Sequence, residues 1–188
     1  MIARERALAM VKSHVKRKNL FKHILAVEAI MKDLAIELKE DEMVWALAGL
    51  LHDVDFDETF DKPELHAKRS VEILEEEATG EVPEQIIHSI KAHNHEYTGV
   101  SPETKLDNAL IAADAVSGLV VAAALVIPSR KLSDLDPSNV ERRFKEKDFA
   151  RNCSRENMLC CEKIGIQKER FFEIALNSLK GISDELEL

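Results

Sequence analysis

Residues 109–127 form an almost uninterrupted apolar run that is nearly long enough to cross a lipid bilayer. One carboxylate, Asp114, lies inside the run, and a charge at the centre of a bilayer is costly. The chain holds no second segment of this kind. We therefore expect no membrane span but a central buried helix, on which Asp114 needs a cation or a metal as its partner, or stays protonated.

The composition around this run favours helices over strands. Ala, Leu, Ile, Glu and Lys dominate, whereas the chain has only six Gly and five Pro. With 45% hydrophobic and 32% charged residues in 188 positions, the sequence is typical of one globular domain. We predict an all-α, single-domain helical bundle over residues 1–188.

Apolar stripes at helical spacing, together with Pro and Gly punctuation, predict where the helices lie. The cleanest stripe falls within residues 20–39, and the next helix begins near Asp41 and carries residues 43–54. The remaining helices are expected over residues 2–16, 63–80, 83–93, 102–127, 137–147, 155–164 and 168–180.

The net charge of −9 excludes a broad nucleic-acid-binding surface, because such surfaces contact phosphates through many Lys and Arg side chains. A small phosphorylated substrate remains compatible with this net charge.

Three cysteines without metal-site spacing, and an N-terminus without the apolar core of a signal peptide, indicate a reducing cytoplasm. Apolar helices in a domain of this size also allow a homodimer.

The adjacent pair His52-Asp53 ends the apolar helical stretch of residues 43–54. Burying an imidazole and a carboxylate is costly unless a partner satisfies both, and a divalent transition metal suits both at once. Gly49, one turn earlier, leaves room beside the pair. The alternative is a satisfied core histidine next to a helix-terminal aspartate. The dipeptide alone favours this alternative, because two adjacent residues are a weak motif, and the rest of the chain has to decide.

Further inward-facing polar residues lie on other predicted helices. They are His23, His66 and His93, which join His52-Asp53 and Asp114. Helical bundles build metal sites from side chains that converge on the core from separate helices. His14 and His88 are expected to face outward.

The order His…His-Asp…Asp on helices of an all-α domain resembles the HD-domain superfamily of metal-dependent phosphohydrolases, in particular its small stand-alone HDIG-type predicted hydrolases. The segments that carry the resemblance are Lys22–Val27, Gly49–Asp53 and Ala112–Asp114. The resemblance covers residues 20–130, and residues 131–188 are expected to form C-terminal packing helices. It implies a divalent metal bound by His23, His52, Asp53 and Asp114.

Two other segments resemble the subgroup of this family that holds two metals. One begins at His66, and the other is His93-Asn94-His95-Glu96, which has Asn94 in the place of a second histidine. A second ion, bound by His66 and His93, therefore stays open. Mixed imidazole and carboxylate ligands leave Mn, Fe, Co, Ni, Zn and Mg as candidates.

The implied activity is hydrolysis of a phosphate ester of a nucleotide or another small phosphorylated molecule. The expected catalytic residues are Asp53, Asp57 and Lys131. Asp57, four positions after Asp53, is expected to position the attacking water or move a proton, and Lys131 or Arg130 to neutralise the phosphate. The alternatives are a non-catalytic metal- or nucleotide-binding regulatory domain and a di-iron oxygenase.

Overall fold

The computed structural model describes residues 1–188, and the chain is helical throughout with no β-strand. The all-α prediction is therefore confirmed. The elements in chain order are α1 (Arg4–His14), α2 (Lys18–Leu38), α3 (Glu42–Leu51), α4 (Phe56–Thr59), α5 (Lys68–Glu77), α6 (Glu84–His93), α7 (His95–Thr98), α8 (Lys105–Leu125), the 3₁₀ helix η1 (Leu132–Asp134), α9 (Pro137–Lys145), α10 (Arg155–Met158), α11 (Cys160–Lys163), α12 (Lys168–Gly181) and α13 (Ser183–Leu186).

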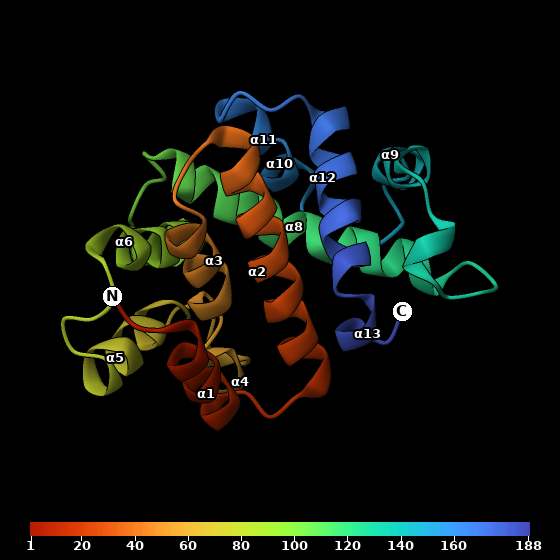
Figure 1. The fold of residues 1–188 in the computed structure, drawn as a ribbon. Coiled ribbons are helices and arrows are strands. Elements are labelled where there is room, and N and C mark those ends of the chain that lie inside the picture. The colour runs from red at the N-terminus through yellow and green to blue at the C-terminus, as the bar shows by residue number, and fades with distance from the viewer.

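The long helices α2 and α8 cross at the centre of the molecule (Figure 1). The α2 helix packs against α3, α8 and α12, and α8 also packs against α6 and the helices of the C-terminal third. One continuous apolar core runs from Ile2 to Leu186. Helices from both ends of the sequence therefore hold α2 and α8 in place.

The α8 helix is the expected central helix. Thr104 and Asp107 form a capping box at its start, in which each side chain accepts a hydrogen bond from the backbone of the other. It is the one helix long and apolar enough to cross a membrane, and 72% of its most apolar window is buried inside the protein. Its apolar surface is thus covered by neighbouring helices.

The backbones of α2 and α3 approach each other closely at Gly49. A Cβ at Gly49 would lie 2.9 Å from the Cα and N of Glu28 and from the carbonyl oxygen of Val27. Gly49 therefore serves the packing of two helices and does not merely leave space beside His52, as the sequence suggested.

Two predicted helix boundaries are wrong. The α3 helix ends at Leu51 and is followed by a turn, so Asp53 and Asp57 do not share one helix face. The α5 helix begins at Lys68 and not at Pro63, because Ala67 takes a positive φ of 68° that a right-handed helix does not allow. In both places the structure has a turn where a helix was predicted. The first turn carries His52 and Asp53, and the second carries His66.

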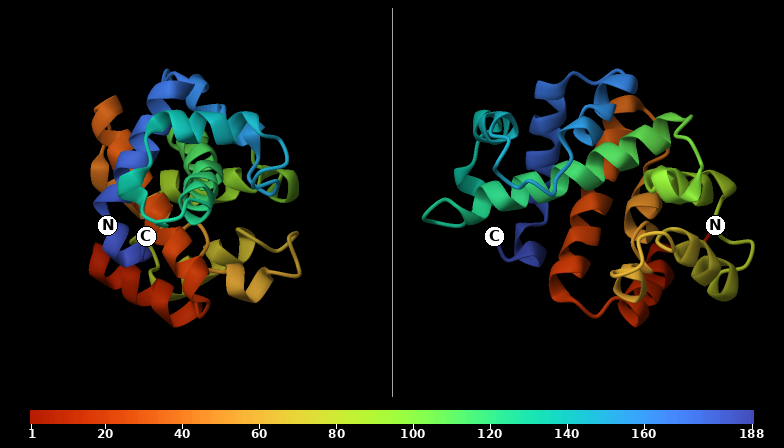
Figure 2. Two further views of the ribbon diagram at one scale, coloured as in Figure 1. Left: turned by 90° about the vertical axis from the view of Figure 1, so that its right-hand side faces the viewer. Right: turned by 180° about the vertical axis from the view of Figure 1, so that it is seen from behind.

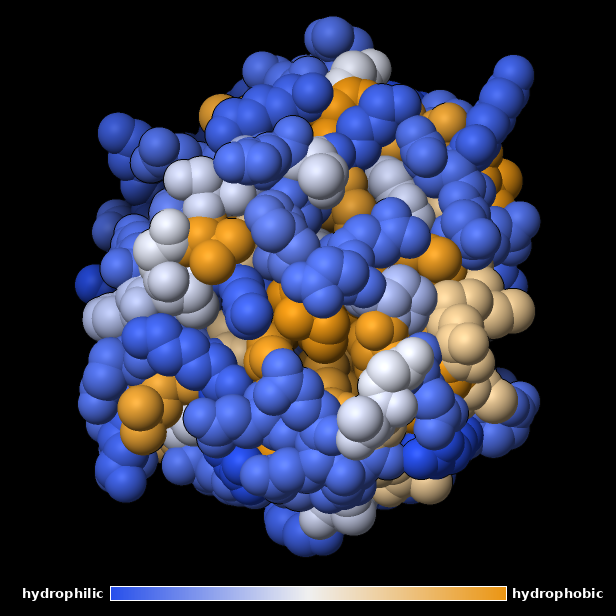
Figure 3. Space-filling view, turned by 90° about the vertical axis from the view of Figure 1, so that its left-hand side faces the viewer, coloured by the Kyte–Doolittle hydropathy of each residue, from blue (hydrophilic) through white to orange (hydrophobic).

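The outer surface is mostly hydrophilic. Figure 3 shows the face on the left of Figure 1, where hydrophobic side chains gather around a hollow near the middle and polar residues surround them.

Candidate metal centre

Six polar side chains from separate parts of the chain converge on one place in the core. They are His23 on α2, His52 and Asp53 after the last turn of α3, His66 in the turn before α5, His93 at the end of α6 and Asp114 on α8. The structure thus brings together all six ligand candidates chosen from the sequence.

These side chains form two groups of three. The first group is His23, His52 and Asp114, and the second is Asp53, His66 and His93. Within each group one nitrogen or oxygen atom per residue lies within 4.8 Å of the others, a spacing compatible with a shared metal ion.

The carboxylate of Asp53 lies between the two groups. Its Oδ2 is 3.6 Å from Nε2 of His23, and its Oδ1 is 3.4 Å from Nε2 of both His52 and His66. Nε2 of His93 is 3.6 Å from the same Oδ1. One carboxylate can therefore serve both groups.

All four histidines are held by their outer ring nitrogen, Nδ1. The Nδ1–H of His52 donates to the carbonyl of Gly49 at 2.7 Å, and that of His93 to the carbonyl of Ile90 at 2.5 Å. The Nδ1–H of His66 donates to Asp55 at 2.9 Å. An imidazole that donates from Nδ1 carries a lone pair on Nε2, and metal-binding histidines are oriented by this kind of bond.

His23 follows the same rule through a hydroxyl. Ser117 Oγ donates to the carbonyl of Asp114 at 2.8 Å and lies 3.0 Å from Nδ1 of His23, so the hydroxyl accepts the Nδ1–H. In each of the four rings, Nε2 is therefore the nitrogen that faces the carboxylates.

The donor set fits a metal. Nε2 of His52 is fully buried and has no hydrogen-bond partner, which is costly for a nitrogen lone pair in the core. Imidazole nitrogens and carboxylate oxygens together are the ligands of divalent transition metals. An ion in the first group would satisfy the one atom of the cluster that the protein itself leaves without a partner.

Charge within the cluster keeps the carboxylates ionised. Burial alone would raise the pKa of Asp53, but His52, His93, His66 and His23 outweigh it, and the pKa falls well below its usual range. The pKa of Asp114 is also lowered, because His23 outweighs the effect of burial. The carboxylates of Asp53 and Asp114 are therefore both available as anionic ligands.

The surroundings of the histidines shift their pKa values in opposite directions. Burial lowers the pKa of His52, in spite of the nearby carboxylates. Burial opposes the charged form of His23 and His66 as well, but hydrogen bonds to Asp114 and Asp55 outweigh it and raise the pKa of each ring. A proton in the metal-free cluster thus resides on these outer rings and not on His52.

The family model of the HD domain matches residues 20–119, just over half of the chain. The chain belongs to the HD-domain family. This confirms the resemblance seen in the sequence, and the family is one of metal-dependent hydrolases. No solved structure matches the chain significantly.

The six ligand candidates together form what we call the HD site. One side of this site is exposed to solvent and the other is buried. The side chains of His23 and Asp114 are 25% and 37% exposed, whereas those of His52, Asp53 and His93 are below 10%. A cavity of about 320 Å³ adjoins His23. A substrate can therefore reach the HD site from the side of α2 and α8.

Asp55 is a residue of the candidate site that the sequence interpretation did not single out. Its side chain is fully buried, with Oδ1 on His66 and Oδ2 accepting the backbone N–H of Ala67 at 3.0 Å. Its apolar neighbours Val54 and Phe56 were the available signal. Asp55 orients a ligand of the HD site and fixes the turn that carries it.

The structure does not place Asp57 among the ligand candidates, contrary to what its expected catalytic role requires. Its carboxylate accepts the backbone N–H groups of Lys16 and Arg17 and pairs with the Arg17 guanidinium. Because α3 stops at Leu51, Asp57 turns toward the start of α2 instead of the HD site. Its role is to anchor that helix.

The structure does not place Lys131 among the ligand candidates either. The loop after α8 protrudes at the far end of that helix (Figure 2). Lys131 lines a polar cavity of about 590 Å³ with Arg130 and Lys180. This cavity shares the wall of Glu187 and Leu188 with the cavity beside His23, but neither His23 nor Asp114 lines it. The length of α8, which runs on to Leu125, places Lys131 away from Asp114.

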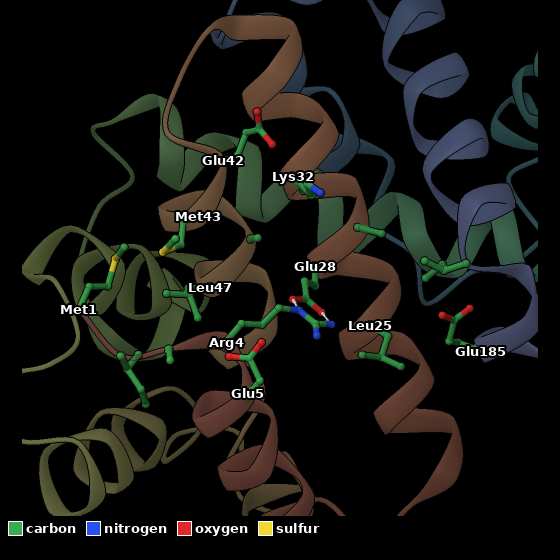
Figure 4. A pocket seen from close by; sticks show the side chains of 15 residues that line it. Met1, Arg4, Glu5, Leu25, Glu28, Lys32, Glu42, Met43, Leu47 and Glu185 are labelled. Atoms are coloured by element: carbon green, nitrogen blue, oxygen red, sulfur yellow. Dashed lines mark hydrogen bonds and ion pairs between the residues drawn. The ribbon is translucent and has the colours of Figure 1, made fainter.

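A larger cavity, of about 780 Å³, lies elsewhere, between the N-terminal segment, α2 and α3 (Figure 4). The Arg4 guanidinium pairs there with both oxygens of Glu28, at 2.5 and 2.9 Å. None of the six ligand candidates lines this cavity. The candidate site is therefore chosen by its ligand geometry and not by the size of a cavity.

Proposed function

We propose that this HD-domain protein hydrolyses a phosphate ester of a small molecule with the help of two divalent metal ions. The observation that carries the proposal is the position of Asp53. Its carboxylate completes the group of His66 and His93 and also approaches His23 and His52 of the other group. Two ions held close together can act on the attacking and the leaving oxygen of one phosphoryl group.

His23, His52 and Asp114 would hold one ion, and His66 and His93 the other, with Asp53 serving both. When bound, such ions polarise the phosphoryl group and lower the pKa of a coordinated water. Four imidazoles and two carboxylates favour Mn, Fe, Co, Ni or Zn over Mg, which prefers oxygen ligands.

The chain's own residues orient the ligand side chains and exclude water from the inner side of the site. The buried side chains of His52, Asp53 and His93 close the inner side of the site to water. Asp114 presents an ionised oxygen on the open side, where it can accept a hydrogen bond from the attacking water. Asp55 and Ser117 hold His66 and His23 with Nε2 directed inward.

The test is phosphate release from p-nitrophenyl phosphate, bis(p-nitrophenyl) phosphate and a set of nucleotides, after loading with each candidate metal in turn. We expect release by the wild type with at least one metal, and background rates for Asp53→Asn. A wild-type protein that holds two ions and cleaves none of these esters would contradict the proposal. Full activity of Asp53→Asn would do the same.

The donor set also supports a di-iron oxygenase as a second candidate, because four imidazoles and two carboxylates, one of them shared, suit a pair of iron ions. The same preparations distinguish the two. Iron-dependent oxygen consumption without phosphate release would favour the oxygenase, and neither activity would favour a non-catalytic regulatory domain.

A further inference from the structure

The cavity that adjoins His23 is formed by three parts of the chain. The α2 helix contributes Asn19 and Lys22, α8 contributes Ser117 and Val121, and the segment 186–188 forms the remaining wall. Lys22 is the only Lys or Arg that lines this cavity. Any anion that enters beside His23 therefore meets one ammonium group.

Lys22 is already engaged. Its Nζ donates to the carbonyl of Leu186 at 2.6 Å and lies 2.9 Å from Oε2 of Glu187, while the side chain is only 20% exposed. Glu187 also binds Lys18, at 2.6 Å through Oε1. The lysine that faces the cavity is thus neutralised by a carboxylate from the cavity's own wall.

A phosphate group at the HD site would compete with this carboxylate. Both are anions with oxygen acceptors, and charge-assisted hydrogen bonds to an ammonium are stronger than neutral ones. Glu187 is held only by two lysines, and its side chain is 58% exposed, so it can leave the cavity without burying a charge. Lys22, on α2 next to His23, stays in place.

We propose that Lys22 binds the phosphate of the substrate, and that Glu187 is a resident counter-ion whose side chain the phosphate displaces into solvent. The choice of phosphate rests on the proposed function. Lys22 would then be a substrate-binding residue, and the Glu187 side chain the part of the wall that moves on binding.

The cavity also narrows the substrate class. Its volume of about 320 Å³ lies at the small end of ligand sites, and Val121, Leu125 and Leu186 line it with apolar side chains. This space suits a phosphomonoester with one compact organic group. A dinucleotide would need the wall to be displaced completely.

The experiment measures binding of inorganic phosphate to metal-loaded protein by calorimetry, so it needs no turnover. Lys22→Gln should raise the Kd about tenfold or more, because an ionic hydrogen bond is lost. Lys22→Arg should retain most of the affinity. Glu187→Gln should lower the Kd severalfold, because the competing anion is gone.

The matched control is Lys18→Gln. Lys18 binds the same Glu187 but is 69% exposed and does not line the cavity. Its substitution should leave the phosphate Kd within about twofold of wild type. Equal binding by Lys22→Gln and wild type would overturn the proposal, and so would weaker binding by Glu187→Gln.

The experiments distinguish failure of the Lys22 phosphate site from failure of the proposed phosphohydrolase activity. Lys22-dependent phosphate binding without hydrolysis of any ester supports the binding site and contradicts the phosphohydrolase. Hydrolysis with a KM that Lys22→Gln leaves unchanged supports the phosphohydrolase and overturns the binding site.

Discussion

The Nε2 atoms of His66 and His93 lie 3.0 Å apart, although each ring already donates its Nδ1–H to another group. Two nitrogen lone pairs therefore face each other beside the carboxylate of Asp53. Such an arrangement is favourable only with a cation at that place, either a proton or a metal ion. The raised pKa of His66 lets a proton meet this need in the metal-free protein, and a metal ion bound by the second group would meet it in the loaded protein.

Metal content should follow this grouping. We expect about two ions per wild-type chain, about one for His93→Ala, and almost none for Asp53→Asn, because Asp53 contacts both groups. Elemental analysis of protein purified without chelator measures this ratio. His95→Ala is the control, since His95 is exposed and two residues from His93. Loss of one ion only in Asp53→Asn would show that the carboxylate is not shared.

Asp55→Asn should weaken the second group without removing a ligand. The amide can still accept from His66, but its NH₂ group would then face the backbone N–H of Ala67. Losing such a supporting hydrogen bond typically costs about 10- to 100-fold in metal affinity. Competition with a chelator of known affinity measures the change. Asp57→Asn is the matched control and should bind metal like wild type, since Asp57 contacts Lys16 and Arg17 instead.

The helical part of this arrangement could be foreseen from the sequence, because ligands such as His23, His93 and Asp114 are polar residues on apolar helix faces. The positions of Asp55 and Asp57 could not, because they depend on where α3 ends. The turn after Leu51 sends one carboxylate inward to His66 and the other outward to Arg17. A pattern of helical spacing holds no information about such a turn.

Lys131 was misplaced for a related reason. Its proximity in sequence to Asp114 suggested proximity in space, but α8 continues for eleven residues beyond Asp114 to Leu125 at about 1.5 Å per residue. Lys22 was overlooked although it precedes His23. Its relevance arises from the wall formed by the segment 186–188, which no local pattern connects to α2.

Gly49→Ala should destabilise the protein by roughly 1–3 kcal/mol. The new methyl group would lie 2.9 Å from the backbone of Glu28 and would push α2 and α3 apart. Gly118→Ala is the comparison, because its methyl group would meet only the Sγ of Cys153, at 2.7 Å, and a side chain can move. Urea unfolding should give the larger loss for Gly49→Ala. The reverse order would show that the backbone contact is less rigid than the structure indicates.

His14 should make stability depend on pH. The sequence suggested an exposed residue, but its ring bridges Glu58 at 3.1 Å and Glu77 at 2.6 Å. Burial opposes the charged form, yet these two hydrogen bonds outweigh it and raise the pKa of His14 above 6.5. The ion pairs therefore stabilise fully below about pH 6.5, and the stabilisation is lost as the pH rises through the raised folded-state pKa.

The measurement compares the free energy of unfolding of wild type and His14→Gln across this range. We expect a difference of about 1 kcal/mol or less near pH 5.5, shrinking toward about pH 8.5. A difference that grows with pH would show that His14 is neutral in the folded protein.

The ligands of the HD site are spread along the chain from His23 to Asp114, and each comes from a different helix or turn apart from the adjacent pair His52-Asp53. An unfolded chain cannot offer them together, so the ions bound by the two groups would be cross-links that exist only in the native state. The fraction of folded molecules then depends on the free metal concentration as well as on temperature. A cell that runs short of the metal would therefore lose the protein itself to proteolysis, and not only its activity.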